Sequence, residues 1–462
     1  MQGYDDRYVA LGPSENCTAP HLASCSTTAC AVVIGGSGAG GCRSGWTDIA
    51  SNVRGLAWLG LIGAWSGLTF LALRMAANSP THATLWVVLS AVALMRLPLL
   101  VEPPYLSSDM YRYIWDGRVQ GNRINPYVFV PAAPELAHLR DSAIYPNINR
   151  ADYAPTIYPP AAQMVFWLIT RFGDSVLALK LGFLVFEGLA MAAMMGILRL
   201  LSLPPSHVLA YAWHPLTVWE IAGNAHVDAV LLSLMSLSLL VALRGRTSAA
   251  GVIASIAVFV KPTALLLMPV IWRPWNWKLP LLLAAIGAAL YVPYLGAGRK
   301  VLGFLSGYVA EEELGTGGGF RYLKLVESLT GPIPHGGTLY LTAAALILSA
   351  LALRIGFRAD RSPAATVRAY AVLLIAFLIL LTPHYPWYYL AIAPLLALQP
   401  RMLTPWVLAT GGFLLYDVFE GDRMPPFAIR EGCLHLMALA ALVYDYFNER
   451  APVLVASHGS SA

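Results

Sequence analysis

Carboxylates, guanidinium groups and aromatic rings are concentrated in one stretch of this chain, SSDMYRYIWDGRVQGNRINPYVFVP at residues 107–131. A carboxylate can accept a proton from a hydroxyl group as a new bond forms, and guanidinium groups bind phosphate oxygens. Only 12% of the whole chain is charged, so such a set stands out. The charged members are Asp109, Arg112, Asp116, Arg118 and Arg123, and the aromatic members are Tyr111, Tyr113, Trp115, Tyr127 and Phe129.

The spacing in this stretch predicts one helix over residues 109–121, with a capping serine just before it and the Asn-Pro pair at 125–126 after it. The first-turn position favours an ionised carboxylate at Asp109, because the helix dipole is positive there. A helix that merely lies in the membrane interface, with its Tyr and Trp as an aromatic belt, is the alternative that spacing leaves open. The residues predicted on one face, at i, i+3, i+4 and i+7, are Asp109, Arg112, Tyr113 and Asp116.

The elements around this stretch are apolar. The 462 residues are 57% hydrophobic, with a mean hydropathy of +0.61. Apolar runs recur from about residue 55 to residue 447, and many approach the roughly 20 residues that a membrane-spanning helix needs. We therefore expect an all-α fold, a polytopic transmembrane helical bundle with on the order of 10–12 membrane segments, some too short to cross alone. The net charge of +5 comes from short basic loops, which predict cytoplasmic ends rather than a nucleic-acid partner.

Two long polar stretches, residues 102–160 and 298–337, interrupt the apolar pattern. Loops of such length are usually functional, so we expect them to be a first catalytic loop and a second loop of one transmembrane domain, 55–447. The tails at 1–54 and 448–462 lie outside this domain, and we expect the first to be disordered. The first tail matches G-x-G-x-x-G, but the membrane segments begin too soon after it for a dinucleotide-binding βαβ unit.

Polar residues also occur inside the apolar part of the chain. Lys261 precedes Pro262, which predicts a helix broken into two halves. A charge at membrane depth is costly and so marks a functional candidate, although a lysine can also extend its amine to the interface. Asn224, His226 and Asp228 in GNAHVDA suit hydrogen bonds to sugar hydroxyls, or Asn224 simply caps the next helix.

Two further candidates lie later in the chain. Arg321 follows a glycine-rich stretch that either closes over a substrate or is a plain flexible loop. His384 begins HYPWYY, whose aromatic residues suit stacking on a sugar or prenyl chain, or an interfacial belt.

Five segments match one known family in order. They are SDMYRYIWDGRVQGNRINPYVFVP, IYPPAAQMVFWLI, WHPLTVWEIAGNAHVDAVLLSL, VKPTALLLMPVIW and HYPWYYLAIAPLL. In this series the chain resembles the polytopic glycosyltransferases of the GT-C superfamily. The closest likeness is to glycosyltransferase family 87 and the polyprenol-phosphate-mannose-dependent mannosyltransferases, and it covers residues 55 to about 445.

The resemblance implies an integral membrane glycosyltransferase with Asp109 as general base. Such an enzyme moves a sugar from a polyprenyl-phosphate donor to a lipid or glycan acceptor of the cell envelope. The resemblance to mannosyltransferases implies that the sugar is mannose. It implies a multi-pass protein of the cell (inner or plasma) membrane, with its active site facing outside the cytoplasm. No cofactor or metal is implied, and a divalent cation is not demanded.

The residues fit this chemistry independently. A lipid phosphate leaves as a stable anion, so no second carboxyl is needed as an acid, in contrast to glycosidases. We expect Asp116 to partner Arg112 rather than act as a second base.

A polyprenyl-linked sugar flippase or transporter, or a non-catalytic envelope scaffold, is the alternative function. The candidates for the phosphate are Arg112, Arg118, Lys261, Arg321 and His384; the other substrate-binding candidates are Tyr113, Asp116, Asn224, His226 and Asp228.

Overall fold

The computed structural model describes residues 45–416 and 426–450 of the chain. The chain divides into two units, Met1–Thr47 and Asp48–Ala462, and every candidate site residue belongs to the second. The predictions for the tails, including the glycine motif and its surroundings, fall almost wholly outside the described residues.

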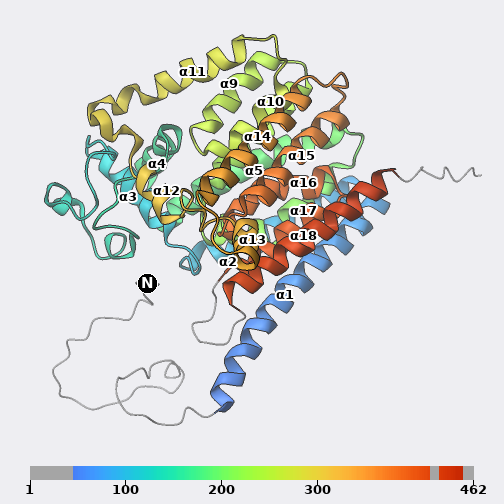
Figure 1. Cartoon of the computed structure of the whole chain (residues 1–462), viewed down its shortest axis with the longest axis horizontal. Helices are drawn as coiled ribbons and strands as arrows, with labels where there is room; N and C mark the ends of the chain where they lie inside the picture. Colours follow the sequence, from blue (N-terminus) through green and yellow to red (C-terminus); the bar gives the residue numbers. More distant parts are fainter. Residues whose placement is uncertain (1–44, 417–425, 451–462) are drawn as a thin grey trace, which may run out of the picture. The chain divides into compact units, whose positions relative to one another are not determined.

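Every regular element in the described part of the chain is helical, which confirms the predicted all-α class (Figure 1). The α-helices are α1 (Gly45–Asn78), α2 (His82–Val101), α3 (Asp109–Gly121), α4 (Pro160–Phe172), α5 (Val176–Leu200), α6 (Leu209–Ala212), α7 (Pro215–Thr217), α8 (Asp228–Leu243), α9 (Thr247–Val258), α10 (Met268–Ile271), α11 (Lys278–Tyr291), α12 (Leu305–Glu311), α13 (Arg321–Thr330), α14 (Gly336–Gly356), α15 (Pro363–Leu381), α16 (Ala393–Leu398), α17 (Leu403–Gly411) and α18 (Phe427–Arg450). The remaining helical segments are 3₁₀-helical except for η4, which is π-helical: η1 (Pro134–Leu139), η2 (Tyr145–Asn147), η3 (Pro205–Val208), η4 (Val218–Gly223), η5 (Pro262–Leu267), η6 (Val292–Leu302), η7 (Pro386–Ile392) and η8 (Gly412–Leu415).

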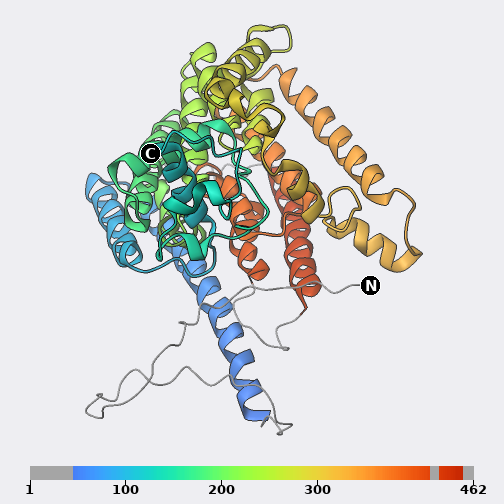
Figure 2. The same ribbon diagram turned by 90° about the vertical axis from the view of Figure 1, so that its left-hand side faces the viewer.

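Seven helical stretches of the described chain are long and apolar enough to cross a membrane, and five shorter apolar stretches accompany them. The polytopic bundle is therefore confirmed. The prediction of 10–12 membrane segments is reached in the described chain only when the five shorter apolar stretches are counted with the seven long ones. The long helices present apolar surface outward, since only 11% of the α14 window and 17% of the α2 window are buried inside the protein. Figure 2 shows α14, in orange, at the side of the bundle.

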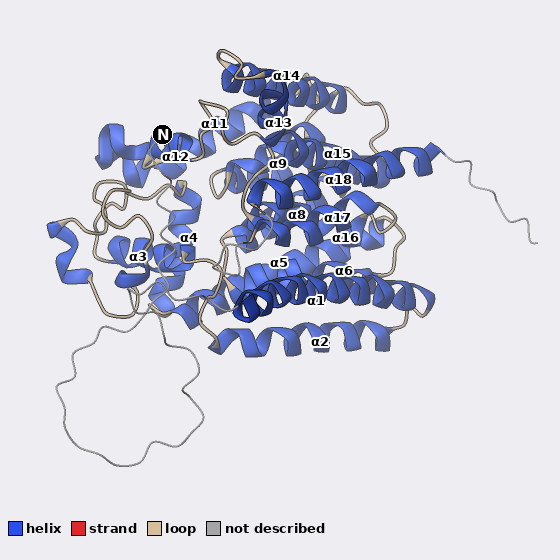
Figure 3. Cartoon of the chain, turned by 60° about the horizontal axis from the view of Figure 1, so that its bottom comes forward, coloured by secondary structure: helices blue, strands red, loops and turns tan. Residues whose placement is uncertain are grey.

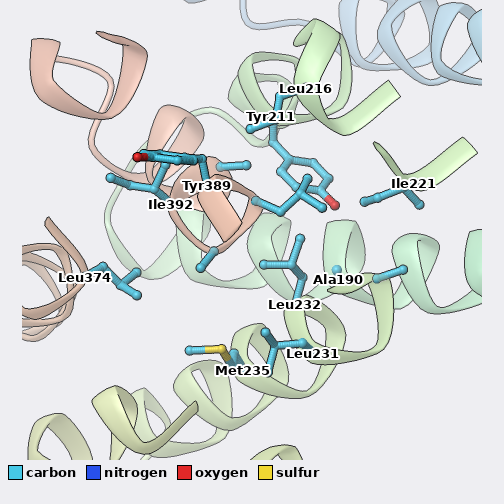
Figure 4. Close-up of a cluster of buried hydrophobic side chains, with 14 of the residues drawn as sticks. Ala190, Tyr211, Leu216, Ile221, Leu231, Leu232, Met235, Leu374, Tyr389 and Ile392 are labelled. Atoms are coloured by element: carbon cyan, nitrogen blue, oxygen red, sulfur yellow. The ribbon is translucent and has the colours of Figure 1, made fainter. Parts of the chain in front are cut away.

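Helix α8 forms the centre of the core, where it packs against α5 and α9. Gly196 of α5 faces the end of the Leu240 side chain of α8, which a Cβ atom at that position would meet at 2.9 Å. Figure 4 shows Leu231, Leu232 and Met235 of α8 in one buried cluster with aromatic and aliphatic side chains from other elements. Those other side chains are Ala190, Tyr211, Leu216, Ile221, Leu374, Tyr389 and Ile392.

Two buried cations fix the end of α2 against α5. The guanidinium of Arg96 forms a bidentate pair with Glu187, at 2.7 Å and 2.5 Å, and both side chains are almost fully buried. The amine of Lys180 donates to the carbonyl groups of Leu99 and Glu102 at 2.5 Å and 2.6 Å. A cation at the end of a helix satisfies its free carbonyl groups and the negative end of its dipole. The chain therefore enters the first polar stretch from a fixed point.

The first polar stretch folds into a buried helical layer at one end of the bundle, where Figure 3 shows α3, α4 and α12 together. Helix α3 runs from Asp109 to Gly121, as predicted, and packs on α4. Contact is closest at Gly117, where a Cβ atom would lie 2.5 Å from the Phe166 carbonyl oxygen. The cap differs in detail from the prediction: Ser108 occupies the N-cap position without a side-chain bond, and the Asp109 amide donates to the Ser107 hydroxyl at 3.3 Å.

The predicted break at Lys261 is confirmed. Helix α9 ends at Val258, Lys261 is extended with φ −153° and ψ 129°, and a tight turn begins at Pro262. Proline has no amide hydrogen and excludes helical backbone from the residue before it.

Removing one charge of the α2–α5 pair should destabilise the fold. In Glu187→Gln the guanidinium of Arg96 stays buried without its counter-ion, which costs about 3–5 kcal/mol. We expect a clear drop in the thermal unfolding midpoint of the purified protein in detergent. Glu135→Gln is the control, because it removes an exposed carboxylate of the same size far from this ion pair in the sequence. Equal midpoints for both variants would show that the pair does not stabilise the helix packing.

Candidate active site

Asp109 stands at the start of α3 with a half-buried side chain. Its Oδ1 accepts a hydrogen bond from the side-chain amide of Asn149 at 3.0 Å. This bond holds one oxygen of the carboxylate, and the charge of Asp109 also acts on the guanidinium of Arg150, the residue after Asn149.

Buried tyrosines line the neighbourhood of Asp109. Burial raises the pKa of Tyr158, and the charge of Asp109 raises it further. Burial likewise raises the pKa of Tyr113, followed by the effect of Tyr158 and of the charges on Asp109 and Asp228. Both carboxylates are therefore close enough to act on one hydroxyl group. The ring of Tyr113 is fixed by stacking on Phe166, with centroids 4.6 Å apart.

Arg112 and Asp116 pair with each other, as expected, and connect α3 to its surroundings. The Arg112 Nε donates to Asp116 at 2.9 Å, and its Nη1 donates to the Ala154 carbonyl at 3.0 Å. The other oxygen of Asp116 accepts from the Gln163 amide of α4 at 2.8 Å. Asp116 is 1% exposed and Arg112 is 5% exposed, so both are parts of the scaffold beneath Asp109.

Arg118 lies at the other end of α3. It comes nine positions after Asp109, about 14 Å along the helix axis. Its guanidinium contacts Asp141 at 2.6 Å and Asp174 at 2.8 Å, and donates to the Leu139 carbonyl at 3.0 Å. The structure thus does not bring Arg118 together with Asp109. Its contacts fasten η1 and the turn before α5 to α3.

Lys261 and Asp228 form an ion pair at the broken end of α9. The amine lies 2.9 Å and 3.0 Å from the two oxygens of Asp228, which is 2% exposed. The same amine lies 4.4 Å from the centre of the Tyr388 ring, a cation–π distance. Tyr388 in turn bonds to the hydroxyl of Tyr308 on α12. Lys261 therefore points into the protein rather than towards an interface.

The GNAHVDA segment follows a π-helical turn, η4, and contains strained backbone at Ala225, whose φ is +50°. π-turns and positive-φ residues other than glycine are concentrated at functional sites. Asn224 does not cap α8, since Val227 occupies that position. Its amide donates to Glu220 at 3.0 Å, and the His226 ring lies 3.3 Å from the same carboxylate. His226 also stacks on Trp387, with centroids 4.6 Å apart.

Arg321 and His384 are brought together, but around a different carboxylate. Glu431 of α18 lies 4.0 Å from the Arg321 Nε and 3.6 Å from the His384 Nε2. The backbone amide of Arg321 donates to the Thr382 hydroxyl at 3.1 Å, which ties α13 to the turn that carries His384.

Several residues of the site escaped the sequence analysis. Glu311 of α12 accepts from Arg150 at 2.7 Å and from the Tyr153 hydroxyl at 3.0 Å, so the second loop closes on the first beside Asn149. The acidic run at 311–313 was a signal for such a contact. Glu220 lies within a tryptophan-containing motif that the sequence analysis quoted without singling it out. No three His, Cys, Asp or Glu side chains of the described residues are grouped so as to hold a metal ion.

The two aspartates of α3 should respond differently to neutralisation. In Asp116→Asn, Arg112 loses its buried counter-ion and an amide must face two donors, so we expect a loss of about 3–5 kcal/mol in unfolding free energy. In Asp109→Asn the half-buried side chain still accepts from Asn149, and we expect an unchanged unfolding midpoint in detergent. A midpoint for Asp116→Asn that matches Asp109→Asn would contradict a scaffold role for Asp116.

The amino-acid sequence is similar to a known protein family and to two named proteins. Residues 25–283 match the family described as alpha-(1->6)-mannopyranosyltransferase, N-terminal domain. Two proteins named alpha-(1->6)-mannopyranosyltransferase A are also similar. The one from Mycobacterium tuberculosis is 27% identical over 243 residues, 50% of this chain and 42% of that protein. The one from Corynebacterium glutamicum is 27% identical over 232 residues, 46% of this chain and 45% of that protein.

The matched part is thus less than half the length of either relative. No solved structure matches the chain. The family match covers more than half of the 462 residues and includes α3 with Asp109, the GNAHVDA segment and Lys261. This chain therefore belongs to the alpha-(1->6)-mannopyranosyltransferase family, in agreement with its resemblance to polyprenol-phosphate-mannose-dependent glycosyltransferases.

Proposed function

We propose that this protein is a membrane mannosyltransferase that moves mannose from a polyprenyl-phosphate donor to a lipid or glycan acceptor of the cell envelope. The observation that carries the proposal is the state of Asp109. Its carboxylate is half-buried at a helix N-terminus and is held through one oxygen by Asn149. Its charge acts on the Tyr113 hydroxyl together with the charge of Asp228, the partner of Lys261. The family and its two named relatives support the mannosyl group.

In this proposal Asp109 is the general base. The acceptor hydroxyl attacks the anomeric carbon of the donor sugar, the bond from that carbon to the phosphate oxygen breaks, and Asp109 takes the hydroxyl proton. The lipid phosphate leaves as an anion with no need of a proton. A buried acid is therefore not required opposite Asp109, unlike in glycosidases.

Lys261 is the preferred partner of the donor phosphate. Arg112 and Arg118 are each held by carboxylates and carbonyl groups of the scaffold. Lys261 is also paired, with Asp228, but 17% of its side chain is exposed, against 6% for Arg112 and 11% for Arg118. Its broken helix end supplies irregular backbone, which is tolerated at membrane depth where it lines a cavity. A lysine amine can bind phosphate as a point charge.

The placement of the basic loops supports a site that faces outside the cytoplasm. Asp228 begins α8 and Arg244 follows its end, which a 16-residue helix separates by about 24 Å. At α10, Arg358 and Arg361 both donate to the Val270 carbonyl, so the basic 354–361 loop meets the basic 272–278 loop. Basic loops are retained on the cytoplasmic side, which would leave the opposite, Asp109-bearing end outside.

Neutralising the base should abolish most transfer without unfolding the protein. Membranes that contain the wild type or Asp109→Asn are supplied with radiolabelled polyprenyl-phosphate mannose and endogenous lipid acceptors. We expect transfer to fall by about 10²–10⁴-fold, the usual effect of losing a general base. Asp152→Asn, an exposed acid of the same loop, is the control and should transfer normally.

Other outcomes would refute parts of the proposal. Equal transfer by Asp109→Asn and wild type would keep the enzyme class and reject Asp109 as the base. If the wild type transferred no label from any of a panel of prenyl-linked sugars but moved them across the bilayer, the protein would be a flippase.

A further inference from the structure

A second polar cluster lies where α13, α18 and the turn after α15 meet. It consists of Arg321 from α13, His384 from the turn, and Glu431 and His435 from α18. Glu431 and His435 are four residues apart and so share one face of α18. Neither is used in the reaction at Asp109.

The groups of this cluster face one another without touching. Glu431 lies 4.0 Å from the Arg321 Nε and 3.6 Å from the His384 Nε2. Hydrogen bonds between such atoms are normally 2.7–3.2 Å long, so neither separation is a hydrogen bond, and the His384 ring bonds instead to the backbone of Gly319. Within the described chain, Oε1 of Glu431 and both ring nitrogens of His435 have no hydrogen-bond partner.

The side chains of Glu431 and His435 are buried as well as unpaired. The Glu431 side chain is 5% exposed and His435 is 2% exposed. Buried polar groups are nearly always hydrogen-bonded, because leaving them unpaired costs stability. A carboxylate and a ring that are both buried and unpaired on one helix face indicate that a ligand completes their bonding.

The cluster opens on one side. The side chains of Arg321 and His384 are 21% and 28% exposed, whereas Glu431 lies deeper. Two aromatic rings stand beside it: Phe427 lies 5.8 Å from the His384 ring, and Tyr322 lies 5.5 Å from the His435 ring. A ligand would therefore meet Arg321 and His384 first, the Glu431 carboxyl group below them, and aromatic rings at the sides.

The charges of the cluster favour a neutral ligand over a phosphate. Arg321 is opposed by Glu431, and His384 lies 4.0 Å from the Glu312 carboxylate. Burial, followed by the charge of Lys324, lowers the pKa of His384, so its ring is neutral at pH 7 and can donate or accept. A mixture of donors and acceptors with little net charge suits hydroxyl groups, which do both.

We propose that this cluster binds sugar hydroxyls of the glycan acceptor, with the Glu431 carboxylate accepting from one hydroxyl and Arg321 and His384 donating to its neighbours. The donor sugar must lie at Asp109, so a neutral site without contact to Asp109 suits acceptor residues farther from the reacting carbon. Helix α12 links the two places, because Glu311 binds Arg150, next to Asn149, and Glu312 faces His384. This inference rests on the proposed transferase function.

A binding experiment tests the site without requiring turnover. A soluble mannose disaccharide is added to the purified protein in detergent, and contact is followed by saturation-transfer NMR. We expect binding to the wild type and to Asp109→Asn, and at least about tenfold weaker binding to Glu431→Gln, the effect of losing one charged hydrogen bond. Arg321→Gln should weaken binding similarly, and it serves as a second variant if Glu431→Gln does not fold by its melting curve. No binding to the wild type, or binding to both cluster variants as tight as to the wild type, would overturn the inference.

The transfer assay then separates this inference from the proposed function. With the wild type active, Glu431→Gln should raise the KM for the acceptor about 10- to 100-fold and leave the KM for the donor unchanged. Glu135→Gln, an exposed acid, should change neither value. An unchanged acceptor KM in Glu431→Gln would overturn the acceptor site alone. A wild type that binds the disaccharide but transfers no mannose would overturn the proposed function alone.

Discussion

The pairing of buried charges is the constraint on which this structure depends. Hydrocarbon offers neither water nor counter-ions, so a charged side chain at membrane depth must find an opposite charge or backbone carbonyl groups within the protein. Arg96 meets Glu187, Arg112 meets Asp116, and Lys261 meets Asp228. The pairs of Arg96 and of Lys261 join different segments and so fix where one lies on the other. Arg112 and Asp116 lie on one helix, and together they bind Ala154 and Gln163 of its neighbours. Apolar packing holds the bundle together, and the buried ion pairs fix how its segments are placed against one another.

Irregular backbone accompanies these charges where the bundle carries its polar residues. The π-turn before His226, the extended residue Lys261 and the left-handed Thr382, with φ +43°, each interrupt a helix near a candidate residue. Helix ends expose backbone donors and acceptors that a continuous helix would consume. Interrupted helices thus supply a site with polar groups that apolar side chains cannot provide.

The two long loops act as one unit. Arg150 of the first loop pairs with Glu311 of the second, and Tyr308 of α12 bonds to Tyr388 above Lys261. Asn149, next to Arg150, holds Asp109. A movement of α12 would therefore change the support of Asp109, the cover over Lys261 and the surroundings of His384 together. Such coupling suits an enzyme that must bring a donor and an acceptor into one place.

The sequence by itself determined the helical membrane class, the bounds of α3 and the break at Lys261. Hydrophobic runs, an Asp in a first turn and a Lys-Pro pair act within a few residues, so they need no tertiary context. The tertiary structure decided which charges are free. Arg118 is occupied by Asp141 and Asp174, and Asp116 by Gln163, partners about 23 to 56 residues away in the chain that no local signal names. Glu431 became part of a cluster only because α18 packs beside α13. Charges are paired across helices, and that pairing depends on which helices meet.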